Sequence, residues 1–244
     1  MEGSTTIQDI VWTGSWDLLS LENQQAWLNS IRPDLAKQLG TEWPDQLELE
    51  LRLYENRDLL RRAIGKQAKK PWVIVFTHAQ KSHHHAIIHV LTPKEWDTFT
   101  VAELPAFLLH EMVHVLHFYH RGKLGPSWFA EGMAHSVAHG FKPKEIEKAL
   151  PQIPNGRTLD SYHVWNLDAT RNLVDFRPWI NYPEAIDFLI GYRIFRKLND
   201  AQRLNIFRMF FQGEDIKEAF VKTLNQPWKT LRLIPGTLIT NKLS

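Results

Sequence analysis

The chain has 244 residues, of which 43% are hydrophobic, and its formal net charge at pH 7 is +2. This length is enough for one large domain with its own core, and the near-neutral charge gives no indication of a nucleic-acid or membrane-surface partner. The absence of cysteine excludes disulfide bonds, thiolate zinc sites and a cysteine nucleophile, so any metal ion must be bound by His, Asp or Glu.

The first hundred residues predict helices and strands in alternation, because apolar residues recur there with helical or alternating spacing and polar turns separate them. The expected elements are a helix over 21–40 that is interrupted at Pro33, a strand over 46–54, a helix over 57–67, and strands over 71–76 and 86–91. A polar turn at 78–85 separates the last two strands, which we expect to form a hairpin.

Helices dominate after residue 100. Their expected spans are 101–120, 127–139, 143–150, 182–198, 200–211 and 214–224. A small sheet followed by a mainly helical half is an α+β arrangement. We expect a single domain over 1–244, with a helix-and-sheet part (1–100) and a helical part (101–244), because the site described below draws on both parts.

Residues 110–114 read His-Glu-Met-Val-His. On a helix, positions i and i+4 lie on one face a turn apart, so His110 and His114 can bind one tetrahedral zinc ion. Glu111 leans toward the same face, where its carboxylate can act as the general base on a water molecule. The helix is apolar on nearly every side, which predicts that it is buried, and a dication would offset the cost of burying Glu111.

Residues 126–134 read Pro-Ser-Trp-Phe-Ala-Glu-Gly-Met-Ala. Pro126 is typical of the first turn of a helix, which puts Glu131 in a second helix that can lie against the first. A carboxylate from this helix completes three protein ligands and leaves one zinc position open for water.

The two motifs, HExxH and WxxEGxA, are similar to those of the gluzincin peptidases of the peptidase MA-like group, whose relatives include thermolysin and aminopeptidase-N-like enzymes. Sixteen residues separate His114 from Glu131, which is a plausible gluzincin gap. The resemblance implies a zincin-like fold, in which a small mixed sheet has an edge strand over the active-site helix. It also implies one Zn2+ ion bound by His110, His114 and Glu131, with Glu111 as the base.

In such peptidases a strand beside the active-site helix holds the extended substrate. By its order in this chain, the strand over 86–91 takes that place, with Ile87, Ile88 and His89 as the substrate-binding residues. The physical mode would be β-addition, in which the N–H and C=O groups of an edge strand pair with a peptide.

The resemblance further implies a residue that stabilises the oxyanion of the tetrahedral intermediate. Tyr182 resembles the tyrosine that aminopeptidase-N-like enzymes use for this purpose. His163 is the alternative donor, by analogy with the histidine of thermolysin.

A different ligand set is also open, because the histidine run continues to His117 and His120. A metzincin peptidase would use His120 as its third ligand, but metzincins have Gly at the position of His117, where the helix must turn. This departure and the downstream WxxEGxA motif favour Glu131. His135, four residues after Glu131, is expected to touch the site without binding the metal.

The sequence therefore predicts a zinc metallopeptidase that hydrolyses a peptide or protein substrate, and an endopeptidase in particular, since no Gly-x-Met-Glu-Asn segment precedes His110. The alternative is a catalytically silent binding or regulatory module on a zincin scaffold. No stretch reaches the roughly 20 apolar residues of a membrane span, and the N-terminus lacks a basic segment followed by an apolar one, so a cytoplasmic location is expected. The sequence gives no indication of the oligomeric state.

Overall fold

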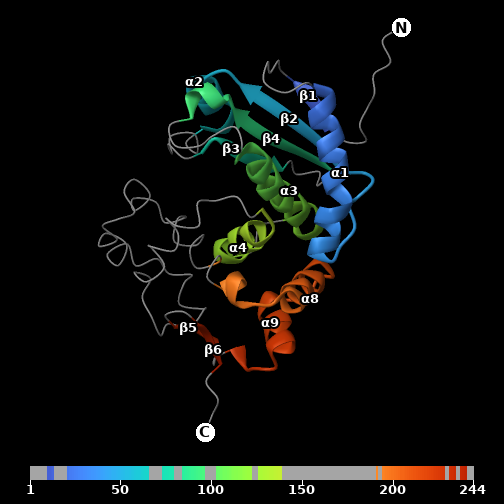
Figure 1. Ribbon diagram of the computed structural model, residues 1–244, viewed down its shortest axis with the longest axis vertical. Coiled ribbons are helices and arrows are strands. Elements are labelled where there is room, and N and C mark those ends of the chain that lie inside the picture. Colours follow the sequence, from blue (N-terminus) through green and yellow to red (C-terminus); the bar gives the residue numbers. More distant parts are fainter. Residues whose placement is uncertain are drawn as a thin grey trace, which may run out of the picture. The chain divides into compact units, whose positions relative to one another are not determined.

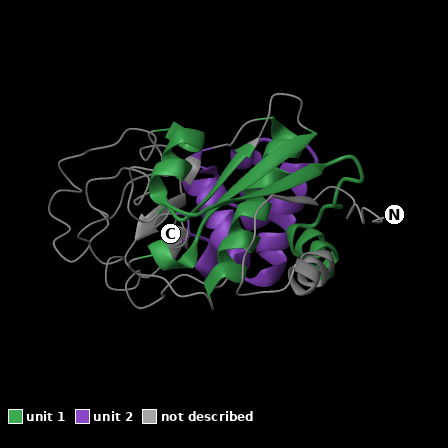
Figure 2. Ribbon diagram, turned by 90° about the horizontal axis from the view of Figure 1, so that it is seen from above, with its two compact units in different colours: residues 1–123 green, residues 124–244 purple. Residues whose placement is uncertain are grey.

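A computed structural model describes most of the chain outside residues 139–190. The described residues are 10–13, 21–65, 73–79, 84–96, 103–122, 126–138, 191, 194–228, 231–234 and 237–240. The chain forms two compact units, Met1–Lys123 and Leu124–Ser244 (Figure 2). None of the described helices combines the length and apolar character that crossing a lipid bilayer requires.

The first unit holds a four-stranded sheet and three α-helices among its described residues. In chain order these are β1 (Ile10–Thr13), α1 (Leu21–Leu39), β2 (Glu48–Tyr54), α2 (Arg57–Ile64), β3 (Val75–Ala79), β4 (His85–Leu91) and α3 (Leu104–Arg121), with a 3-10 turn at Pro93–Glu95 before α3 (Figure 1). Helix α1 runs through Pro33 without a break, so the predicted interruption is wrong.

The strand order is β1-β2-β4-β3, with β1, β2 and β4 parallel and β3 antiparallel to β4. The predicted hairpin is confirmed, although β3 starts at Val75, later than the expected strand over 71–76. The prediction that the strand over 86–91 is an edge strand is wrong, because Ile88 of β4 is in register with Leu51 of β2 on one side and Thr77 of β3 on the other. The edges of this sheet are β1 and β3.

One face of the sheet is apolar and supports α3. Alternating residues of β2 and β4, among them Leu49, Leu51, Ile88 and Val90, are almost completely buried on this face. Helix α3 runs beside β3 (Figure 1), and the Thr77 hydroxyl donates a hydrogen bond of 3.3 Å to the main-chain oxygen of Glu111. The antiparallel edge strand is therefore attached to the helix that carries the HExxH motif.

The second unit is mainly helical in its described part. It contains α4 (Ser127–Ala138), α8 (Asp200–Phe211), α9 (Ile216–Leu224), β5 (Leu231–Ile234) and β6 (Thr237–Thr240). A capping box between Asn199 and Gln202 starts α8, and the Asp215 side chain caps α9. Aromatic rings fill its core, namely Trp128, Phe129, Phe195, Phe207, Phe210 and Phe220.

The chain is thus α+β, as predicted, with a small mixed sheet and mostly helical content. The predicted helices 101–120, 127–139, 200–211 and 214–224 correspond to α3, α4, α8 and α9. The antiparallel pair β5–β6 was not predicted, since helices were expected to the end of the chain. The predicted helix over 143–150 and most of the one over 182–198 lie outside the described residues.

Candidate metal centre

Helix α3 brings three histidines to one buried face. His110, His114 and His117 follow each other at steps of four and three residues, and their exposed fractions are 6%, 6% and 0%. The helix ends at Gly122, whose φ of 68° is left-handed and whose N–H bonds to the Phe118 oxygen. The low exposed fractions of the three histidines place their rings inside the protein, on a helix that is buried on most of its surface.

The two histidines of the HExxH motif face each other. Their Nε2 atoms are 3.0 Å apart, and their ring centroids are 4.6 Å apart in an edge-to-face arrangement. Two nitrogen ligands of one tetrahedral zinc ion, each about 2.0–2.1 Å from it, would be about 3.3 Å apart. The His110–His114 pair thus has nearly the spacing that a shared zinc ion requires.

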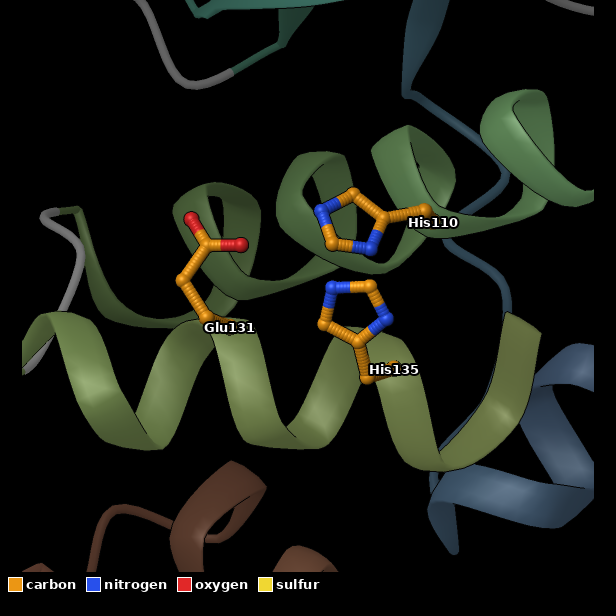
Figure 3. A group of neighbouring side chains, drawn as sticks. All are labelled: His110, Glu131 and His135. Carbon is orange, nitrogen blue, oxygen red and sulfur yellow. The ribbon is translucent and has the colours of Figure 1, made fainter. Parts of the chain in front are cut away.

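Helix α4 carries the second set of ligand groups. Glu131 and His135 are four residues apart, and His135 is buried with an exposed fraction of 4%. Ligand atoms of His110, Glu131 and His135 all lie within 4.8 Å of one another, and Figure 3 shows the three side chains. Two ligand atoms of one tetrahedral zinc ion are about 3.3 Å apart, so the atoms of this group would have to come closer by up to about 1.5 Å to bind the same ion. The His110 and His135 rings are buried, Glu131 is partly buried, and the predicted ligand His114 is not part of this group. The three side chains could hold a metal ion, and imidazole and carboxylate are donors that zinc accepts.

Gly132 explains the Glu-Gly pair of the second motif. A Cβ atom at Gly132 would lie 2.6 Å from Cα of Gly191 and 2.5 Å from a ring carbon of Phe195. The backbone of α4 is therefore packed directly against the segment around Gly191, and no side chain fits between them. This contact holds α4 in place immediately beside Glu131.

Glu111, the predicted base, is partly buried on α3. Its main-chain oxygen accepts the hydrogen bond from Thr77, which ties this turn of the helix to the edge strand β3. The contact positions the backbone of Glu111 relative to a strand that pairs on one side with β4.

His120 lies on a different face of α3. Its Nε2 atom is 3.2 Å from the Thr41 hydroxyl, in the turn that follows α1. Burial lowers the pKa of His120, and a backbone hydrogen bond at Glu42 acts in the opposite direction. This ring is engaged with the α1 turn, so the described geometry gives no support to the metzincin alternative.

The predicted substrate residues lie within the sheet. Ile87 and Ile88 are buried, and β4 pairs on both sides, so its backbone is already used in ladders with β2 and β3. His89 is 2% exposed, and its Nδ1 atom is 2.7 Å from the Tyr54 hydroxyl, with the two rings stacked. A peptide cannot add to β4 by strand pairing, because β-addition needs a free edge.

Burial lowers the pKa of His89 to about 4, so that the ring is neutral at pH 7. Arg52 and His78 lower it further by charge repulsion, whereas Glu50 raises it. The Glu50 carboxylate itself bonds both Nε and a terminal nitrogen of Arg52, at 2.5 and 2.8 Å. His89 therefore belongs to a polar network on the opposite sheet face from Thr77 and α3.

Tyr182 and His163, the two predicted oxyanion donors, lie outside the described residues. His135 belongs to this ligand group although the sequence pattern did not predict it as a ligand. Its signal was present, because its i+4 spacing from Glu131 repeats that of His110 and His114.

No protein-family model matches this chain, and a search of curated proteins also gives no match.

Proposed function

We propose that the protein is a zinc-dependent metallopeptidase with a zincin-like fold. The observation that carries the proposal is the pair of buried Nε2 atoms, 3.0 Å apart on one helix, in a motif that also contains Glu111. Glu131 supplies the third ligand, and the proximity of its carboxylate to His110 supports this role. When bound, zinc would lower the pKa of water toward neutrality and polarise the scissile carbonyl.

Glu111 is the general base of the proposed reaction. It stands next to His110 in the sequence, and in the proposed reaction it takes a proton from the attacking water and passes it to the leaving amine. Tyr182 or His163 is proposed to stabilise the oxyanion. The products are a carboxylate and a protonated amine: one proton of the water reaches the leaving nitrogen through Glu111, and the second follows from the new carboxylic acid.

The substrate strand of this proposal is β3, in place of β4. Among the described strands β3 has a single neighbour, β4, and it runs antiparallel to it beside α3. An extended peptide could pair with its other edge, within reach of the helix that carries Glu111. The hydrogen bond from Thr77 to the Glu111 oxygen supports this choice, because it joins the strand to the catalytic turn. A peptide held along an edge in this way suits an endopeptidase.

The proposal is tested by comparing the wild type with Glu111→Gln. We expect the variant to retain one zinc ion per chain and to lose peptide hydrolysis by about 10²- to 10⁴-fold, which is the usual contribution of a general base. Glu218→Gln, a change at an exposed position of α9, is the matched control and should leave both readouts unchanged. If the wild type binds zinc and cleaves nothing in a broad peptide library, the silent-module alternative is correct instead.

A further inference from the structure

Helix α4 carries a pair of ligand groups with the same spacing as the pair on α3. Glu131 and His135 are four residues apart, so both side chains leave the same face of the helix. Figure 3 shows the His135 ring close to that of His110, and the Glu131 carboxylate one turn away along α4. The ligand set of the proposed function leaves His135 without a role.

His110 links the two pairs. Its Nε2 atom is 3.0 Å from that of His114, and one of its ring nitrogens lies within 4.8 Å of ligand atoms of Glu131 and His135. His114 is outside the group whose ligand atoms all lie within 4.8 Å of one another, and it adjoins that group through His110; the rings of His110, His114 and His135 are all buried. Four donors of this kind match the coordination number and the ligand preference of zinc.

We propose that His135 is a fourth protein ligand of the ion, so that the resting site is held by His110, His114, Glu131 and His135. The inference rests on the proposed function, because it concerns the same ion. Zinc sites with four protein ligands are closed, whereas catalytic sites keep one position for water. His135 therefore has to leave the ion before the proposed reaction can begin, and it acts as a blocking group within the chain.

A different role for His135 makes a different prediction. If its ring only bonds to the ring of His110, it orients that ligand without touching the ion. Both roles would weaken zinc binding when His135 is replaced, since outer hydrogen-bond partners alone are worth about 10- to 100-fold in metal affinity. Affinity therefore does not separate the two roles, but the number of imidazoles bound to zinc does.

The test is X-ray absorption at the zinc edge on the full chain loaded with one equivalent of zinc, which counts the imidazole ligands. We expect three imidazoles in the wild type and two in His135→Asn, with His135→Asp as a second variant if the first does not fold. His120→Asn is the matched control, because this ring bonds to Thr41, and it should keep three.

Two imidazoles in the wild type would overturn the role of His135 and leave the proposed peptidase site intact. Three imidazoles in both the wild type and a folded His135 variant would overturn it as well, because another histidine would then be the third. Failure of the wild type to bind zinc would overturn the proposed function together with this inference.

Discussion

Acidification should destabilise the protein through His89, and replacing this residue should remove that part of the pH dependence. Its pKa in the folded state is about 4, compared with the ordinary value of 6.5, and burial is the largest cause. Between these two values the unfolded chain binds a proton at this residue that the folded protein does not bind. The stabilisation is therefore complete above pH 6.5 and is lost as the pH falls toward 4.

The size of this effect follows from the shift in pKa. The difference between pKa 6.5 and about 4 corresponds to roughly 3.5 kcal/mol at about 1.4 kcal/mol per pKa unit, and about 3 kcal/mol of it is lost between pH 7 and pH 4. Urea unfolding at pH 7.0, 5.5 and 4.0, in the presence of a chelator, would measure the loss in the wild type and in His89→Phe. We expect the difference in unfolding free energy between the two proteins to change by up to about 3 kcal/mol over this range.

Tyr54→Phe tests whether burial or the hydrogen bond to Tyr54 lowers the pKa of His89. It removes the hydrogen bond of 2.7 Å to His89 Nδ1 but leaves the ring buried, so most of the pH dependence should remain. If His89→Phe has the same pH dependence as the wild type, the reasoning from burial is refuted. If Tyr54→Phe abolishes the dependence, the hydrogen bond is the cause in place of burial.

Three further predictions concern packing, positioning and metal linkage. Gly132→Ala should lower the unfolding free energy by about 1–3 kcal/mol in urea titrations, because its Cβ would lie 2.6 Å from Cα of Gly191; an unchanged midpoint would contradict the close packing. Thr77→Val should cost about 1 kcal/mol through the lost bond to the Glu111 oxygen, whereas Thr77→Ser should restore most of it. Zinc at 100 times its Kd should stabilise the wild type by about 2.7 kcal/mol in thermal unfolding and His110→Asn by much less; equal gains would argue against His110 as a ligand.

The helices of the site could be predicted because their signals are local. His110 and His114 are in one helix with an apolar pattern, and Pro126 directly precedes the other helix. Helices α3 and α4 accordingly form close to the expected bounds. The α+β class followed from the same local patterns. Short strands gave weaker signals: β1, β5 and β6 have four residues each and were missed.

The position of β4 within the sheet could not be read from the local pattern. The hairpin with β3 is a local feature and was predicted, but the parallel partner β2 is separated from β4 by α2 and β3, and nothing in the strand over 86–91 specifies it. The sequence of a strand that is buried on both faces and paired on both sides is a continuous apolar run. A strand at the edge of a sheet can have the same sequence pattern. His135 was undervalued for a related reason, since its proximity to His110 depends on how two helices pack.

The central claim is that one zinc ion is bound by the histidine pair of α3 together with Glu131 of α4. Calorimetric titration of the chelator-treated protein with zinc tests it most directly, using the wild type, His114→Asn and Glu131→Gln, with Glu218→Gln as the exposed control. The account predicts one zinc ion per chain in the wild type and control, and binding weakened by at least about tenfold in the other two. Wild-type protein that binds no zinc, or variants that bind it as tightly as the wild type, would contradict the account.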